Sequence, residues 1–228
     1  MKHFFIRIIR LYFGIFLTSV GVVMTYNANL GLSPWDVFHQ GISKITGITI
    51  GVATIIVGVV IVIINAFMRE RLGWGTLINM VFVGVFIDLL MLNGLIPVFH
   101  SFVARLAMML AGLFVIGVGS FFYIGSGLGA GPRDGLMVVL TQKTKKSVRL
   151  VRSTIETAAL VIGFALGGTV GVGTVISALV IGFFVQLAFK IFKFDVSSVE
   201  HRYIDQDIKW IKSKLLSRST GKGKVRQI

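Results

Sequence analysis

Long apolar stretches are the dominant pattern along this 228-residue chain. In each of them the apolar residues occupy the whole helical circumference rather than one face, which distinguishes them from helices on the surface of a soluble protein. Crossing the roughly 30 Å hydrocarbon layer of a bilayer takes about 20 helical residues. Windows of this length lie at approximately residues 8–27, 48–68, 74–96, 103–126, 150–168 and 172–192. The pattern predicts an all-α, polytopic membrane protein with six transmembrane helices in one membrane domain, residues 1–195.

The composition narrows the functional classes. Hydrophobic residues make up 55% of the chain and charged residues only 14%, whereas an average soluble protein has about 25% charged residues. There is no cysteine, and the four histidines are scattered, so disulfides, thiolate chemistry and a zinc or haem site are not expected. We expect no bound metal or other cofactor. No nucleophile–base pair is visible either, so we do not expect an enzyme.

Basic residues are unevenly distributed between the predicted connections. If the N-terminus is cytoplasmic, 21 of the 23 Lys and Arg residues lie on the cytoplasmic side, and only Lys44 and Arg105 lie outside. The positive-inside rule then holds at every connection. We therefore expect both termini in the cytoplasm.

The tail after the last predicted span, residues 196–228, is basic. Apolar and basic side chains alternate over residues 200–218 as in a short amphipathic helix that lies on an anionic inner leaflet; a solvated charged tail is the alternative. The net charge of +14 is divided among the cytoplasmic rims instead of being concentrated on one soluble face, so nucleic acid is not an expected partner. The expected partners are the lipid bilayer and a small solute, and the sequence leaves homo-oligomer formation open.

An internal repeat is the most informative feature. When the chain is aligned with itself at an offset of 98 residues, 17 identities fall over positions 11–92. They include a Leu-Gly-x-x-Pro-x-Asp cluster and a Gly-x-Gly-Thr cluster, which apolar composition alone would not place in one register. Each repeat, about 7–96 and about 105–193, contains three predicted spans. Because three is an odd number, the second repeat enters the membrane from the opposite side, and we expect inverted repeats, a recurrent plan of secondary transporters.

Two loop motifs follow the first span of each repeat: Leu30-Gly-Leu-Ser-Pro-Trp-Asp36 and Leu128-Gly-Ala-Gly-Pro-Arg-Asp134. Glycine permits a positive φ, and proline suits the first turn of a helix, so a short helix is predicted over about 34–45 and 132–143. Ser33 and Asp36 also fit a capping box. If the segments dip into the membrane, they resemble broken helices whose ends bind ions or substrate. If they lie at the surface, Asp36 and Asp134 only cap helices. The candidate loop or gate residues are Gly31, Ser33, Pro34, Trp35, Asp36, Gly129, Gly131, Pro132, Arg133 and Asp134.

Polar residues inside the predicted spans are candidates for a solute pathway, because charges in a bilayer are costly. Asp88 has no basic residue within one helical turn, and its counterpart in the second repeat is Gln186. It either carries a proton or a cation, or it is a protonated acid that joins two helices. Glu156 has Arg152 four residues earlier, so an ion pair within the helix is expected. Asn65 is a further pathway candidate, although such residues more often join helices.

Aromatic residues near the predicted helix ends, Tyr26, Trp35 and Trp74, are of the types that anchor a protein at the membrane interface.

Four segments resemble the YczE/YitT-like family of bacterial integral membrane proteins. They are Gly14 to Gly21, Asn29-Leu-Gly-Leu-Ser-Pro-Trp-Asp36, Gly73-Trp-Gly-Thr76 and the second Gly-Pro-x-Asp block at 131–134. The resemblance covers about 4–195. The soluble C-terminal domain of YitT-type members is not expected here, so the YczE-like branch is the nearer match. The resemblance implies a multi-pass protein of the bacterial plasma (inner) membrane, and it brings no catalytic residues.

Two functions are compatible with these features. The first is transport of a small solute or ion by alternating access between inverted repeats. The alternative is a non-transporting membrane scaffold or regulator that acts through its basic cytoplasmic loops and tail.

Overall fold

The computed structural model describes residues 2–195, 199 and 202–206, and within these ranges every regular element is a helix. The helices are α1 (Lys2–Ala28), α2 (Pro34–Thr46), α3 (Ile50–Phe67), α4 (Trp74–Leu92), α5 (Phe102–Ile124), α6 (Pro132–Thr144), α7 (Val148–Ala165) and α8 (Val172–Ile191). The all-α prediction is confirmed for this part of the chain. The two short helices predicted after the loop motifs are present as α2 and α6.

Five of the described helices are long and apolar enough to cross a membrane: Phe5–Ala28 within α1, then α3, α4, α5 and α8. The remaining predicted span, 150–168, corresponds to α7, which has a similar length but carries Arg149, Arg152 and Glu156 in its first half. The chain is thus a multi-pass helical protein.

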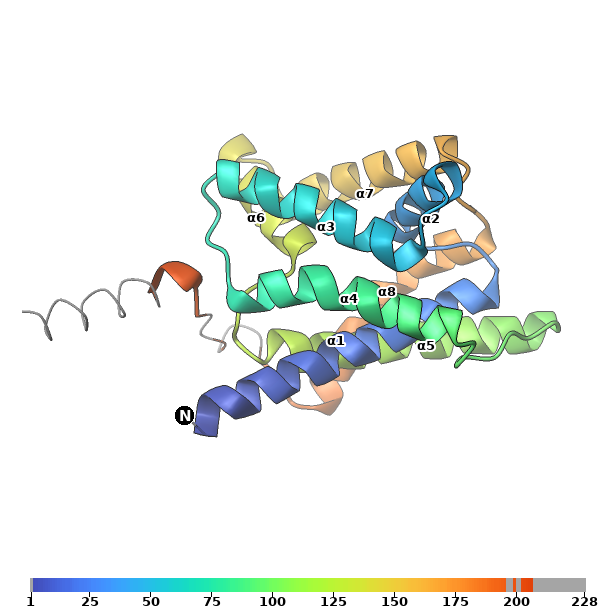
Figure 1. Ribbon diagram of the computed structural model, residues 1–228, viewed down its shortest axis with the longest axis horizontal. Coiled ribbons are helices and arrows are strands. Elements are labelled where there is room, and N and C mark those ends of the chain that lie inside the picture. The colour runs from blue at the N-terminus through green and yellow to red at the C-terminus, as the bar shows by residue number, and fades with distance from the viewer. Residues whose placement is uncertain (1, 196–198, 200–201, 207–228) are drawn as a thin grey trace, which may run out of the picture.

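The long helices lie along the long axis of the molecule and reverse direction in sequence order (Figure 1). In that view α1, α4 and α7 run from left to right, while α3, α5 and α8 run back. The two short helices lie toward opposite ends of the bundle, α6 at the left and α2 at the right.

The helix boundaries repeat at the offset seen in the sequence. Pro34 and Pro132 begin α2 and α6, Ile50 and Val148 begin α3 and α7, and each pair is separated by 98 residues. Contacts between the halves are reciprocal as well: the Gly75 amide donates to the Leu128 carbonyl at 2.7 Å, and the equivalent Gly173 amide donates to the Leu30 carbonyl at 2.6 Å.

The loop motifs depend on glycine at Gly31 and Gly129. Their φ angles, +110° and +117°, lie in a region that disfavours other residues. Each glycine also packs against the turn before α8 or α4: a Cβ on Gly31 would lie 2.5 Å from the Gly171 amide nitrogen, and a Cβ on Gly129 would lie 2.7 Å from the Gly73 Cα. The sequence motif therefore fixes both the turn and its contact with the other repeat.

α1 and α5 cross at the centre of the molecule through glycine contacts. A Cβ on Gly14 would lie 2.8 Å from the Gly119 carbonyl oxygen, and a Cβ on Gly112 would lie 2.8 Å from that of Gly21. The backbones of the two helices therefore meet directly, as small residues allow.

The correspondence fails most clearly where α3 meets α4 and α7 meets α8. α3 packs closely on α4, where Gly51 and Gly84 face each other so tightly that a Cβ on either would collide with the carbonyl of the other. The equivalent helices α7 and α8 barely touch, and no atom lies within 4 Å of a Cβ built on Gly182, the counterpart of Gly84. The two halves thus have the same elements in different arrangements.

The predicted amphipathic helix at 200–218 lies mostly outside the described residues. Residues 202–206 are described: the Arg202 amide donates to the Gly127 carbonyl at 2.8 Å, and the Ile204 amide donates to the Leu72 carbonyl at 3.0 Å. Arg71 pairs with Asp205 at 2.8 Å, and this hydrogen bond raises the pKa of Arg71. The segment connects the loop before α4 to the loop after α5.

Candidate functional site

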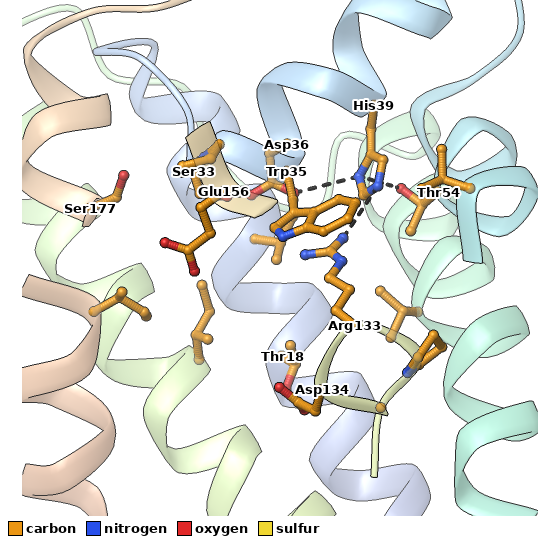
Figure 2. Close-up of a pocket in the computed structure, with 18 of the residues that line it drawn as sticks. Thr18, Ser33, Trp35, Asp36, His39, Thr54, Arg133, Asp134, Glu156 and Ser177 are labelled. Carbon is orange, nitrogen blue, oxygen red and sulfur yellow. Dashed lines mark hydrogen bonds and ion pairs between the residues drawn. The ribbon is translucent and has the colours of Figure 1, made fainter. Parts of the chain in front are cut away.

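A cavity of about 320 Å³ lies where the N-terminal ends of α2 and α6 approach each other (Figure 2). All eight helices contribute to its lining. Many lining residues come in pairs separated by 98 positions: Pro34 and Pro132, Asp36 and Asp134, Thr54 and Arg152, Asn79 and Ser177, Val83 and Ile181. The cavity therefore lies at the junction of the two halves.

The beginning of α2 brings the first loop motif into this cavity. Ser33 precedes the helix, Pro34 starts it, and Asp36 lies in its first turn. The predicted capping box is wrong, since the Ser33 side chain makes no hydrogen bond to the α2 backbone. Its hydroxyl donates instead to Asp36 Oδ2 at 2.5 Å, so Ser33 orients the carboxylate rather than the helix end.

Asp36 belongs to a buried polar network centred on His39. His39 Nδ1 lies 3.7 Å from Asp36 Oδ1 and 3.2 Å from the Thr54 hydroxyl, whose own proton is donated to the Ile50 carbonyl at 2.9 Å. Nε2 of the same ring lies 3.3 Å from an Arg133 Nη2 donor. These partners fit a neutral His39 with its proton on Nδ1 and a lone pair on Nε2 that accepts from Arg133.

Arg133 extends from the first turn of α6 toward this network. Its guanidinium carbon lies 4.8 Å from the centre of the Trp35 ring, a cation–π arrangement. Figure 2 shows the guanidinium directly below the Trp35 indole, with a dashed line from it to His39. The prediction that Trp35 anchors the protein at the membrane interface is therefore wrong, because the ring faces the cavity. It is also wrong for Tyr26, which is 8% exposed and donates to the Asp36 carbonyl at 3.0 Å.

Asp134 follows Arg133 in the same turn and lines the cavity on another side. Its carboxylate lies close to Gly131 and makes no ion pair with any described residue. Its counterpart Asp36 has Ser33 and His39 as partners, but the equivalent positions in the second half are Gly131 and Met137. The same motif therefore holds one acid in a network and leaves the other facing the cavity.

Glu156 lines the cavity from α7 and pairs with Arg152. The Arg152 Nε to Glu156 Oε1 distance is 2.9 Å, which confirms the partner expected from the i, i+4 spacing. The pair is partly exposed, with 56% of the Arg152 side chain and 32% of the Glu156 side chain accessible.

The other three pathway candidates lie outside the cavity. Asp88 accepts hydrogen bonds from the Thr49 hydroxyl at 2.5 Å and the Gly51 amide at 2.8 Å. It therefore caps the start of α3 from α4, close to the expectation of an acid that joins two helices. Asn65 is fully buried and donates to the Pro132 carbonyl at 2.9 Å, and Gln186 is exposed on α8.

The structure thus brings together Glu156 and most of the loop-motif residues, and it adds residues that the sequence did not single out. Of the motif residues, Gly129 is not part of the lining. The additional polar lining residues are Thr18, Thr25, His39, Thr54, Asn79, Ser120, Tyr123 and Ser177, and Arg152 joins them as the expected partner of Glu156. His39 was detectable, because it lies three residues after Asp36 and so shares a helix face with it. Among the described residues, no group of three or more His, Cys, Asp or Glu side chains could hold a metal ion.

These features define a multi-pass helical membrane protein with a charged cavity between two related halves. The chain belongs to a family described as a family of unknown function, DUF6198, whose model matches residues 5–190. The YczE-like resemblance is confirmed: the chain is 37% identical over 177 residues to the uncharacterized membrane protein YczE of Bacillus subtilis (strain 168), covering 77% of this chain and 81% of that protein. It is 34% identical to an uncharacterized protein of Haemophilus influenzae, over 77% of this chain and 80% of that protein. It is 28% identical to the uncharacterized protein YyaS of Bacillus subtilis, over 72% of this chain and 83% of that protein. No solved structure matches the chain.

Proposed function

We propose that this protein transports a small polar solute or ion across the bacterial plasma membrane by alternating access between two inverted repeats. The observation that carries the proposal is the charged cavity at the junction of the halves, between the N-termini of two short helices. Broken helices of this kind provide the binding sites of many secondary transporters. In the proposed arrangement α7 is also a membrane span, its Arg152 and Glu156 face the cavity and not lipid, and both termini are cytoplasmic.

The reciprocal contacts support the inverted arrangement. Under an exchange of the two halves, the Gly14–Gly119 contact becomes Gly112–Gly21, and the Gly75–Leu128 hydrogen bond becomes Gly173–Leu30. A two-fold relation through the α1–α5 crossing accounts for both pairs.

The unequal interfaces support alternating access. α3 is packed on α4 near Thr49 and Asp88, whereas α7 is apart from α8 near the equivalent Ser147 and Gln186. With the N-terminus in the cytoplasm, the closed contact lies toward the outside and the parted helices toward the inside, which is an inward-open arrangement. In the alternate state the halves exchange roles: α7 packs on α8, and α3 leaves α4.

Cross-linking tests this exchange without knowledge of the solute, and the natural chain has no cysteine to remove. Thr49→Cys with Asp88→Cys is expected to cross-link in the state described here. Ser147→Cys with Gln186→Cys is expected to cross-link only during visits to the alternate state. A lasting failure of the second pair to react, in a protein whose first pair reacts, would reject alternating access.

Labelling of a cavity residue tests whether the exchange of the α3–α4 and α7–α8 contacts opens the cavity to each side of the membrane in turn. A Ser177→Cys variant is expected to react with a membrane-impermeant maleimide from the inside, and from the outside when the alternate state is visited. Locking α3 to α4 through the first cross-link should abolish only the outside reaction. If the Ser177→Cys thiol reacts from one side only, with or without the Thr49–Asp88 cross-link, the result would favour the scaffold or regulator function. For that function, residues 202–206, which contact two loops, offer a contact surface.

A further inference from the structure

We propose that the cavity binds a small zwitterion, a molecule of amino-acid size with one carboxylate and one ammonium group. The inference deepens the proposed function and rests on it only for the claim that this molecule is transported. It starts from two charges of opposite sign, Arg133 and Asp134, which line one cavity and make no ion pair within the described part of the chain.

Arg133 has the geometry of a carboxylate receptor. A guanidinium carries five N–H donors, and among the described residues only His39 Nε2 accepts one of them. The guanidinium carbon lies over the Trp35 ring, and the remaining N–H donors have no acceptor among the described residues. They are therefore available to a carboxylate, which guanidinium binds in bidentate fashion. The first turns of α2 and α6 add the partial positive charge of two helix N-termini to this side of the cavity.

Asp134 supplies the opposite charge. More than a third of its surface is accessible, although it lies beneath the outer surface of the bundle, because its carboxylate faces the cavity. In Figure 2 it lies on the Thr18 side, away from the Arg133 guanidinium. A bound ammonium group there would form an ion pair that no described cationic side chain forms with this carboxylate.

The other acids of the cavity already have protein partners. Asp36 is held by Ser33 and lies beside His39, and Glu156 is paired with Arg152. A simple anion at Arg133 would leave Asp134 uncompensated and add repulsion, and a simple cation at Asp134 would face the Arg133 guanidinium. A zwitterion satisfies both groups, and a volume of about 320 Å³ lies at the lower end of the range for small-molecule sites.

The test compares ligands that differ by one charged group. Binding of L-alanine, propionate and ethylamine to the purified full-length protein is measured by calorimetry or by thermal shift. β-Alanine and 4-aminobutyrate are included so that the spacing of the two charges is sampled. We expect the best zwitterion to bind at least about tenfold more tightly than propionate or ethylamine, because each of these leaves one buried charge unpaired.

Variants then assign the two ends of the ligand. Arg133→Gln should bring the affinity for the zwitterion down to that for ethylamine, and Asp134→Asn should bring it down to that for propionate. Arg149→Gln, which removes an exposed charge on α7 outside the cavity, is the matched control and should bind as the natural protein does. Since either cavity variant can fail to fold, the ligand series on the unchanged protein decides by itself.

Propionate or ethylamine binding as tightly as the best zwitterion would overturn the proposal, and so would the absence of binding by all three zwitterions at millimolar concentration. The proposed transport function is judged separately. The Ser147–Gln186 cross-link and the Ser177 labelling need no ligand, so a wrong solute class leaves their outcome unchanged.

Discussion

A matched pair of substitutions, Gly84→Ala and Gly182→Ala, tests the unequal packing of the two halves. The positions are equivalent in the repeat, both lie inside a helix, and both changes add one methyl group. At Gly84 that methyl group would collide with the Gly51 carbonyl and lie 2.6 Å from Ile55 Cγ1, but at Gly182 it would meet nothing within 4 Å.

The size of the effect follows from the difference between the two variants. Replacing glycine by alanine inside a helix stabilises it by up to about 1 kcal/mol, and this gain is common to both changes. Overpacking costs about 1–3 kcal/mol and applies only at Gly84. The free energy of unfolding of Gly84→Ala should therefore be about 1–3 kcal/mol lower than that of Gly182→Ala.

Thermal unfolding in detergent, followed by intrinsic fluorescence, measures this difference. For a chain of this length 1 kcal/mol corresponds to roughly 2–4 °C in Tm, so Gly84→Ala should melt about 2–12 °C below Gly182→Ala. Equal melting temperatures would refute the inference that α3–α4 is closed and α7–α8 open. A lower Tm for Gly182→Ala would mean that the alternate arrangement is the populated one.

Three further substitutions test individual contacts. Asn65→Ala leaves the buried Pro132 carbonyl without its donor and should lower the free energy of unfolding by about 1–3 kcal/mol in a denaturation curve; an unchanged curve would mean that the α6 start does not depend on this bond. Asp88→Asn keeps only one acceptor for the two donors at the start of α3, so it should weaken the α3–α4 contact and speed the Ser147–Gln186 cross-link. Gln186→Ala is the control and should leave stability unchanged. A cross-linking rate that does not change with the Asp88→Asn substitution would contradict this prediction. Glu156→Gln removes one side of a partly exposed pair, so stability should change by less than about 1 kcal/mol in the same denaturation assay, and a variant that fails to fold would make Glu156 structural.

Local sequence chemistry predicted the elements well. Pro34 and Pro132 begin the short helices as expected, because proline and glycine act on their own turn and need no tertiary information. The i, i+4 pair of Arg152 and Glu156 formed for the same reason. These features could be predicted because every group involved lies within one or two helical turns.

The identity of the cavity residues could not be predicted in the same way. Asp88 and Asp134 were both candidates, and only packing between helices decides that one caps a neighbouring helix while the other faces the cavity. The Ser33 hydroxyl had two acceptable partners, and it bonds the Asp36 side chain rather than the backbone. The unequal interfaces are also invisible in the sequence, because the repeat carries the same glycine at positions 84 and 182.

The glycine crossing of α1 and α5 has a mechanical consequence. Helices that pack through interlocking side chains cannot rotate against each other unless each side chain leaves the space between its neighbours on the partner helix. At Gly14 with Gly119 and at Gly21 with Gly112 the two backbones touch, and side chains of the opposite helix, Thr18 and Ile116 among them, lie in the space that a Cβ would fill. The contact is therefore interlocked, and one half of the molecule can move against the other only by pivoting about this contact or by withdrawing these side chains from it.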